Sequence, residues 1–207
     1  LGMLGMHGTY EANNAMHDCD LMINIGARFD DRITGKIDEF SPKSKKVHID
    51  IDPSSINKNV KVDLAIVGDV KNVISSTLKS LKQKKSKFLK SNKQKTSKWW
   101  EKIQKWRSVR SLDYIGSEET IKPQYAIERL YELTKDKDSY ITTEVGQHQM
   151  WAAQHYKFNK PNRWMTSGGL GTMGYGLPAA VGVQVAHPKK LVIDIAGEAS
   201  VLMTIQE

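Results

Sequence analysis

The stretch "DLAIVGDVKNVISSTLKSL" (Asp63–Leu81) contains a short apolar run, a Gly-Asp turn and then a longer segment with helical spacing. The apolar run predicts a strand. The positions of Val73, Ile74, Leu78 and Leu81 predict a helix with one apolar face. A strand followed by a helix is the repeating unit of α/β proteins, so this stretch is typical of one such unit.

Two earlier stretches repeat the apolar run. "DLMINIGARFDD" (Asp20–Asp31) predicts a buried strand closed by Gly26, and "KKVHIDIDPSSI" (Lys45–Ile56) predicts a second strand and a turn. "GTYEANNAMHDC" (Gly8–Cys19) predicts a short helix before them. Three such units within about 80 residues predict a doubly wound parallel sheet. Ligands of these sheets bind at the carboxyl ends of the strands.

The second half of the chain repeats the pattern. "IKPQYAIERLYELT" (Ile121–Thr134) predicts a helix with proline near its start, and "SYITTEVGQHQMWAAQHY" (Ser139–Tyr156) a strand, a glycine turn and a helix. Residues 163–188 predict a glycine-rich loop that leads into a helix of small residues, and "KKLVIDIAGEAS" (Lys189–Ser200) the next strand. We therefore expect an α/β fold with two doubly wound parallel-sheet units, divided into residues 1–80, a connection over 81–120, and residues 121–207.

The positive charge is local. The chain carries a formal net charge of +8, whereas Lys79–Arg110 alone holds eleven lysines, two arginines and one glutamate. Trp99, Trp100, Ile103 and Trp106 follow helical spacing, which predicts an amphipathic helix packed on another element. A nucleic-acid-binding module is one interpretation, and a steep loss of affinity with salt would support it. A charge run is more often a solvated face, so we do not expect nucleic acid as a partner.

Cysteine content and hydropathy indicate the cellular location of the protein. One cysteine, Cys19, excludes an intrachain disulfide and a cysteine-based metal cage. No run of 18 apolar residues occurs, so we expect neither a membrane span nor a membrane partner. Together these features predict a reducing, cytoplasmic location.

Three loops carry residues suited to ligand binding. The glycines of "SGGLGTMGYG" (Ser167–Gly176) allow backbone N–H groups to approach a phosphate or a flat cofactor, but a close-packed corner would use them equally well. His148 follows a strand end, where a single histidine is more often structural than catalytic. Arg28 and Arg32 stand beside two aspartates, a pattern that fits a surface ion-pair loop or a phosphate clamp.

Several motifs together strongly resemble the catalytic subunit of acetohydroxyacid synthases (acetolactate synthases), which are thiamine-diphosphate enzymes of branched-chain amino-acid biosynthesis. The resemblance rests on "GMLGMHGTYEAN", "GARFDDR", "HIDIDP", "GQHQMWAAQHY" and "SGGLGTMGYGLPAA", in family order over nearly the whole chain. It implies most of a central FAD-binding domain followed by the first part of a domain that binds the diphosphate. The family's N-terminal pyrimidine-binding domain, which holds the activating glutamate, has no counterpart here. We therefore expect an internal fragment that holds no catalytic residue and is inactive alone.

The resemblance also assigns cofactor contacts by position. The positions that match FAD contacts are Met6, His7, Gly8, Gly26, Arg28, Arg32, Asp50, Ile51, Asp69, Val70, Gln149, Met150 and Gly168. The positions that match thiamine-diphosphate contacts are Val145, Gly146, Gln147, His148, Gly171, Met173, Ala199 and Ser200, with Met173 beneath the bend of the cofactor. Glu198 matches the magnesium ligand, although the family has aspartate at that position. Glutamate is one methylene longer, so we expect impaired metal binding.

The implied activity joins pyruvate to a second 2-keto acid, pyruvate or 2-ketobutyrate, with loss of CO2. The implied assembly is a homodimer or tetramer with a small regulatory subunit. Another enzyme of the group, such as a pyruvate oxidase or a glyoxylate carboligase, is the alternative, and "GQHQMWAAQHY" argues against both.

Overall fold

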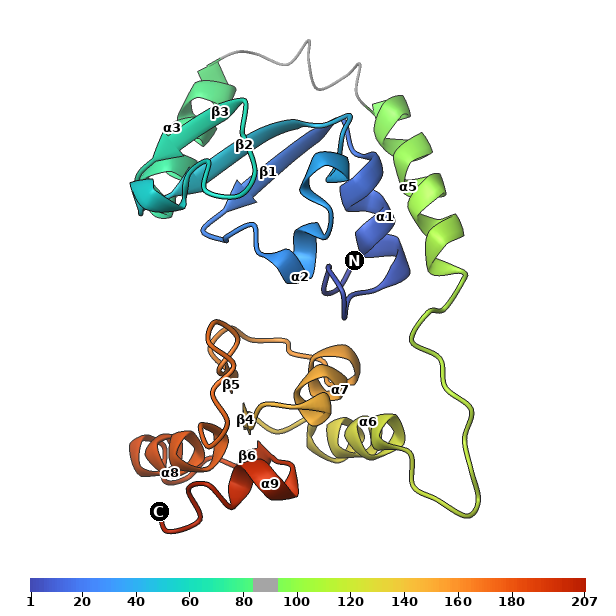
Figure 1. The fold of residues 1–207 in the computed structure, drawn as a ribbon, viewed down its shortest axis with the longest axis vertical. Coiled ribbons are helices and arrows are strands. Elements are labelled where there is room, and N and C mark those ends of the chain that lie inside the picture. The colour runs from blue at the N-terminus through green and yellow to red at the C-terminus, as the bar shows by residue number, and fades with distance from the viewer. Residues whose placement is uncertain (84–92) are drawn as a thin grey trace. The chain divides into compact units, whose positions relative to one another are not determined.

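The computed structural model describes residues 1–83 and 93–207, which form two compact units, Leu1–Ser111 and Leu112–Glu207 (Figure 1). Each unit has a three-stranded parallel sheet with helices around it. The α/β class and the two parallel sheets predicted from the sequence are confirmed. The chain changes unit between Ser111 and Leu112, inside the segment expected as a connection.

The first unit is built on the strand order β1-β2-β3, which follows the chain order. Thr9 caps the first helix by accepting a hydrogen bond from the N–H of Ala12 at 3.1 Å. Phe29, Phe40 and Val60 form the buried cluster beside the sheet. The elements are α1 (Tyr10–Asp18), β1 (Leu21–Ile25), α2 (Asp31–Thr34), η1 (Ile37–Glu39), β2 (Lys45–Asp50), η2 (Pro53–Ser55), β3 (Leu64–Val67), α3 (Val70–Gln83) and α5 (Lys93–Arg107).

Strand β1 differs from the expectation. The strand lies where the sequence predicts it, but the expectation that it is buried is wrong, because Leu21, Ile23 and Ile25 are 51%, 54% and 43% exposed. Helix α3 follows β3 and packs against β2. Among the described residues, the face of β1 that carries Leu21, Ile23 and Ile25 is therefore accessible to solvent. The apolar stripe of α3 is also exposed, at Leu78 and Leu81 among others.

The amphipathic helix predicted in the basic segment is α5, and the element on which it packs is α1. Ile103 is 2% exposed. Lys102 pairs with Asp18 at 2.6 Å, and Arg107 with Glu11 at 3.6 Å. Residues 84–92 of the basic segment lie outside the described residues.

The second unit has the strand order β5-β4-β6, so the chain crosses from one side of β4 to the other. All four residues of β4 are buried, and Ile141 is fully enclosed by a cluster that includes Ile127, Ala152 and Ile195. The short strand β5 was not predicted. The elements are α6 (Pro123–Thr134), β4 (Tyr140–Thr143), α7 (Gln147–His155), β5 (Trp164–Thr166), α8 (Gly176–Ala186), β6 (Val192–Ile195) and α9 (Glu198–Val201).

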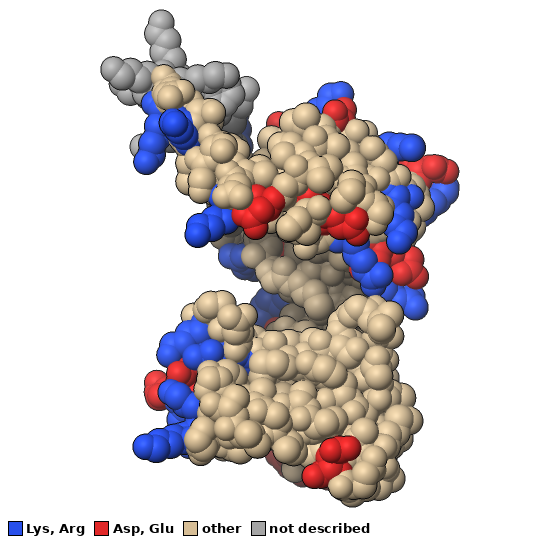
Figure 2. Space-filling model, turned by 90° about the vertical axis from the view of Figure 1, so that its left-hand side faces the viewer, with Lys and Arg blue, Asp and Glu red and all other residues tan. Residues whose placement is uncertain are grey.

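The surface of the second unit, drawn in the lower half of Figure 2, has a wide face without charged side chains. Helix α8 contains no charged residue, and Val181 and Val185 are 43% and 77% exposed. In the described residues no helix is long and apolar enough to cross a membrane.

Candidate functional site

The strand order of the second sheet defines where a ligand would bind. Strands β5 and β6 lie on opposite sides of β4. The direction of the connections therefore reverses between β4 and β6, and the loops that follow these two neighbouring strands begin side by side. In α/β sheets the crevice at such a reversal, at the carboxyl ends of the strands, is the usual ligand site. The loops that meet there begin at Glu144 and at Ala196. Together with the first turns of α7 and α9, which follow them, they contain six of the eight predicted thiamine-diphosphate contacts.

His148 joins these two loops. A Cβ placed on Gly197 would lie 3.0 Å from its Cε1 and 3.1 Å from its Nδ1, so the imidazole lies directly against the second turn. Its Nε2 is buried and makes no hydrogen bond within the described part of the chain. Helix α7 begins after Gly146, which provides no side-chain cap. The N–H of Gln149 donates to the Gly146 carbonyl at 3.1 Å, whereas the N–H groups of Gln147 and His148 precede the hydrogen bonds of the helix and can act as donors to a ligand. A buried unpaired nitrogen beside open N–H donors suits an anionic or polar group.

The glycine-rich loop lies against the same turn. A Cβ on Gly171, where φ is +67°, would lie 3.8 Å from the Val145 side chain. A Cβ on Gly168 would meet nothing within 4 Å, so this part of the loop faces open space. Met173 is 39% exposed. The structure therefore brings Val145, Gly171 and the residues around His148 together at one edge of the sheet.

Glu144 is a functional candidate that the sequence reasoning missed. Its side chain is fully buried, Oε2 accepts a hydrogen bond from the N–H of Gly174 at 2.6 Å, and Oε1 accepts one from Leu177 at 3.0 Å. Nearby, burial raises the pKa of Asp194, and the hydrogen bond from the Thr142 hydroxyl opposes that shift. The available sequence signal was an acidic residue at the end of an otherwise uncharged strand.

The turn after β6 offers limited metal-binding chemistry. Glu198 begins α9 and is exposed, Ala199 is exposed, and Ser200 is 2% exposed with its hydroxyl donating to the Gly197 carbonyl at 3.2 Å. No group of three His, Cys, Asp or Glu residues that could hold a metal occurs in the described residues. Magnesium is often held by one or two carboxylates together with substrate phosphates. Glu198 supplies one carboxylate, so the turn fits magnesium only when a phosphate-bearing ligand supplies further oxygens.

The carboxyl edge of the first sheet gathers several of the predicted FAD residues. The N–H of Gly26 donates to Ile49 at 2.8 Å, the N–H of Gly68 donates to Asp50 at 2.9 Å, and a Cβ on Gly26 would lie 3.9 Å from Val70. Gly26, Asp50 and Val70 therefore lie together, with Asp69 beside Val70 at the start of α3. Ile51 is 70% exposed just beyond β2.

A second group of predicted FAD residues lies in the N-terminal loop. The N–H of Met6 donates to the Arg32 carbonyl at 2.7 Å, which joins the Met6–Gly8 segment, including His7, to α2. Arg28 lies 3.4 Å from Asp30, and Arg32 lies 4.0 Å from Asp31, as a surface ion-pair loop requires. Both arginine side chains are more than half exposed, so they are accessible to a phosphate as well.

The remaining predicted FAD contacts lie in the second unit. Gln149 donates from Nε2 to the Thr166 hydroxyl at 2.7 Å, and that hydroxyl also lies 2.6 Å from the Thr143 hydroxyl. Met150 is the next residue of α7, and Gly168 follows β5.

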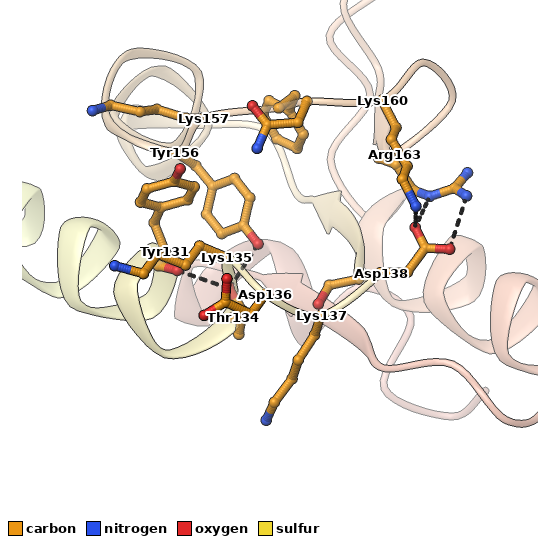
Figure 3. A pocket seen from close by; sticks show the side chains of 13 residues that line it. Tyr131, Thr134, Lys135, Asp136, Lys137, Asp138, Tyr156, Lys157, Lys160 and Arg163 are labelled. Atoms are coloured by element: carbon orange, nitrogen blue, oxygen red, sulfur yellow. Dashed lines mark hydrogen bonds and ion pairs between the residues drawn. The ribbon is translucent and has the colours of Figure 1, made fainter.

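A cavity of about 280 Å³ lies at the opposite edge of the second sheet (Figure 3). At its rim Asp138 is paired with Arg163 at 2.8 Å, Lys190 at 2.9 Å and Lys160 at 3.2 Å. The hydrogen bond from Arg163, followed by that from Lys190, holds the pKa of Asp138 well below its usual range. The cluster links the starts of the three strands, because Asp138 lies shortly before β4, Arg163 before β5 and Lys190 before β6. We assign it a structural role, because ligands of parallel sheets bind at the other edge.

Comparison with known proteins identifies the family to which the chain belongs. Residues 1–77 match the family model described as "Thiamine pyrophosphate enzyme, central domain", and residues 144–207 match "Thiamine pyrophosphate enzyme, C-terminal TPP binding domain". The two matches cover more than half of the chain, which belongs to the thiamine pyrophosphate enzyme family.

Among its relatives are acetolactate synthase large subunits. The chain is 49% identical to that of Haemophilus influenzae, 49% identical to the isozyme 3 large subunit of Escherichia coli, and 51% identical to that of Buchnera aphidicola subsp. Schizaphis graminum. Each comparison covers the whole chain but 35% of the relative's length. The resemblance inferred from the motifs is confirmed.

Proposed function

We propose that this chain is part of an acetolactate synthase large subunit that condenses pyruvate with a second 2-keto acid, pyruvate or 2-ketobutyrate. The observation that carries the proposal is 49–51% identity to such subunits over all 207 residues. The crevice at the end of β4 supports it, because the positions matching the family's cofactor contacts lie together there. The proposed assembly is a homodimer or tetramer with a small regulatory subunit.

The second unit would hold thiamine diphosphate and magnesium. The N–H groups at the start of α7, with Gln147 and His148, would bind the diphosphate end, and Glu198 would supply the carboxylate for magnesium. Met173 and Gly171 would lie along the cofactor, and Ala199 and Ser200 would form the turn beside it. Thiamine diphosphate supplies an electron sink for decarboxylation and carbon–carbon bond formation, and this segment binds, orients and shields it.

The first unit would hold FAD. Gly26, Asp50, Asp69 and Val70 would line the edge of the sheet. Arg28 and Arg32 would neutralise the phosphates, since guanidinium groups bind phosphate oxygens in pairs. Met6, His7, Gly8 and Ile51 complete the contacts proposed for this unit, and Gln149, Met150 and Gly168 those proposed for the second.

The proposal can be tested in a full-length chimera. Residues 1–207 would replace the matching segment of the Escherichia coli isozyme 3 large subunit, with its own small subunit present. We expect acetolactate from pyruvate, dependent on thiamine diphosphate and a divalent metal. A folded chimera that binds thiamine diphosphate but instead forms acetyl phosphate from pyruvate, inorganic phosphate and O2, or tartronate semialdehyde from added glyoxylate, would indicate one of the alternative activities.

Flavin binding gives a readout independent of activity. We expect the chimera to quench added FAD fluorescence, and Arg28→Ala to weaken that binding by about tenfold through loss of a charge-assisted contact. Lys36→Ala is the matched control, because Lys36 is exposed and pairs with Glu39 on η1. Equal FAD affinity in Arg28→Ala would remove this arginine from the site.

A further inference from the structure

Glu144 is an ionisable side chain with no exposure to solvent, at the end of β4. A buried carboxylate is destabilising unless its oxygens receive hydrogen bonds. Both oxygens of Glu144 do, and both donors are backbone N–H groups, those of Gly174 and Leu177. These donors belong to the end of the glycine-rich loop and the first turn of α8, so one side chain joins the central strand to a distant segment.

The contact replaces a local helix cap. The residue before α8, Tyr175, makes no side-chain capping hydrogen bond. Leu177 is the second residue of the helix, and its N–H has no partner within α8. A carboxylate at that place satisfies the N–H and also interacts favourably with the helix dipole. Glu144 therefore caps α8 from a neighbouring strand.

The backbone of the loop is in close contact with β4 as well. A Cβ on Gly176 would lie 2.6 Å from the Glu144 nitrogen and 2.8 Å from the Thr143 carbonyl carbon, so a larger residue there would push the segment away. Gly174 has φ of +81°, a conformation that favours glycine. On its other side the Gly174 carbonyl accepts a hydrogen bond from the Thr204 hydroxyl at 3.2 Å. The segment is held from both directions.

We propose that Glu144 is a positioning residue, which fixes Met173 and the glycine-rich loop against the Val145–His148 turn so that the two halves of the cofactor site keep one spacing. The inference rests on the function proposed above. Met173 precedes the first bonded N–H directly, and Val145 follows Glu144 directly. A shift of the carboxylate would therefore change the distance between the glycine-rich loop, which carries Met173, and the turn proposed to bind the diphosphate.

The test compares Glu144→Gln and Glu144→Asp with Glu132→Gln in the full-length chimera. Glutamine places an NH2 group against one of the two N–H donors, and aspartate is too short to reach both. Glu132 is a matched control, because it lies on the exposed side of α6 and pairs with Lys135. Thiamine-diphosphate affinity is measured by calorimetry, and local opening is measured by amide hydrogen exchange of the cofactor-free protein.

We expect Glu144→Gln to weaken thiamine-diphosphate binding by about tenfold, to leave the pyruvate KM within twofold, and to speed exchange in peptides covering residues 170–178 selectively. The thiamine-diphosphate affinity of Glu144→Asp should lie between those of Glu144→Gln and the unmodified chimera. Glu132→Gln should match the unmodified chimera in both affinity and exchange. Unchanged cofactor affinity would overturn the proposal, as would faster exchange spread evenly over the second unit or failure of both Glu144 variants to fold. Loss of acetolactate formation in the unmodified chimera, with the local exchange effect retained, would instead contradict the proposed function.

Discussion

The imidazole of His148 packs against the backbone of Gly197, with the position of a Cβ on that glycine 3.0 Å from Cε1. His148 belongs to the first turn of α7, and Gly197 immediately precedes α9. The turns that follow β4 and β6 are therefore packed against each other at the point where the strand order reverses. Their spacing depends on the absence of a side chain at residue 197.

Gly197→Ala should move His148. Gly197 has φ of −97° and ψ of 155°, which alanine adopts freely, so the effect comes from the contact with the imidazole and not from backbone strain. We expect thiamine-diphosphate affinity of the chimera to fall about tenfold, with little change in the melting temperature. Gly182→Ala is the control, because a Cβ there meets nothing within 4 Å. Equal affinity in both variants would show that His148 has room to move.

The sequence predicts the positions of the strands better than it predicts their burial. Apolar runs placed β1, β2, β3, β4 and β6, because each run is bounded by glycine or proline turns. Strand β5 has three residues, Trp164–Thr166, too few for any periodicity to show. Burial was predicted less well, since an apolar run such as Leu21–Ile25 shows that a strand can be covered and does not show which element covers it.

The sequence also predicts only part of the candidate cofactor site in the second unit. Motif resemblance marked the glycine-rich loop and the turn around His148, and the structure places them at one edge of the sheet. Glu144 was missed because its two partners lie 30 and 33 residues further along the chain. A contact of that separation leaves no local pattern in the sequence. Its detection needs the fold.

Tyr114 links the start of the second unit to α6 and α7, and its removal should alter the pH dependence of unfolding. Its hydroxyl donates to Glu128 at 2.7 Å, and His155 Nδ1 lies 3.1 Å from the other oxygen of that carboxylate. The hydrogen bond to Glu128 raises the pKa of Tyr114 to about 12, and the same bond is the first cause that lowers the pKa of Glu128.

The sign of the effect follows from these shifts. Because the pKa of Tyr114 is raised from 10.0, its contribution is complete below about pH 10 and is lost as the pH rises towards 12. The contribution of Glu128 is present above its ordinary pKa of 4.5 and is lost at lower pH. We expect Tyr114→Phe to lower the melting temperature by a few degrees at pH 7 and to flatten the decline between pH 10 and 11.5. Tyr125→Phe, at a half-exposed tyrosine of α6, is the control. Parallel pH curves for Tyr114→Phe and the unmodified chain would contradict this role.

The exposed face of β1 should bind a hydrophobic dye when residues 1–207 are produced alone. Leu21, Ile23 and Ile25 lie on one face of the strand, and accessible apolar strands favour association. Ile23→Thr keeps a β-branched residue and removes apolar surface, so we expect lower dye fluorescence and less light scattering. Ile115→Thr is the control, since Ile115 is 89% exposed outside any strand. An equal reduction by both changes would show that general hydropathy, and not the β1 face, controls association.

Glu198 offers a direct test of the proposed metal site. It is exposed at the start of α9, in the turn where the resemblance expects aspartate. Glutamate and aspartate both carry a single carboxylate group, so the difference between them is the reach of the side chain. Magnesium requires near-octahedral oxygen geometry at about 2.0–2.1 Å, and a carboxylate displaced by one methylene has to fold back to meet it.

We expect Glu198→Asp in the chimera to lower the magnesium and thiamine-diphosphate concentrations for half-maximal acetolactate formation by about tenfold, or about 1.4 kcal/mol. Manganese should support the unmodified chimera better than magnesium, because we expect its coordination to be less demanding. Metal affinity is measured separately by manganese electron paramagnetic resonance with the diphosphate present, so that the result does not depend on turnover. Glu207→Asp, at an exposed glutamate outside α9, serves as the control. If the unmodified chimera and the Glu198→Asp variant titrate identically with both metals, reach is not limiting, and the backbone around Ser200 and the diphosphate determine the affinity of the turn.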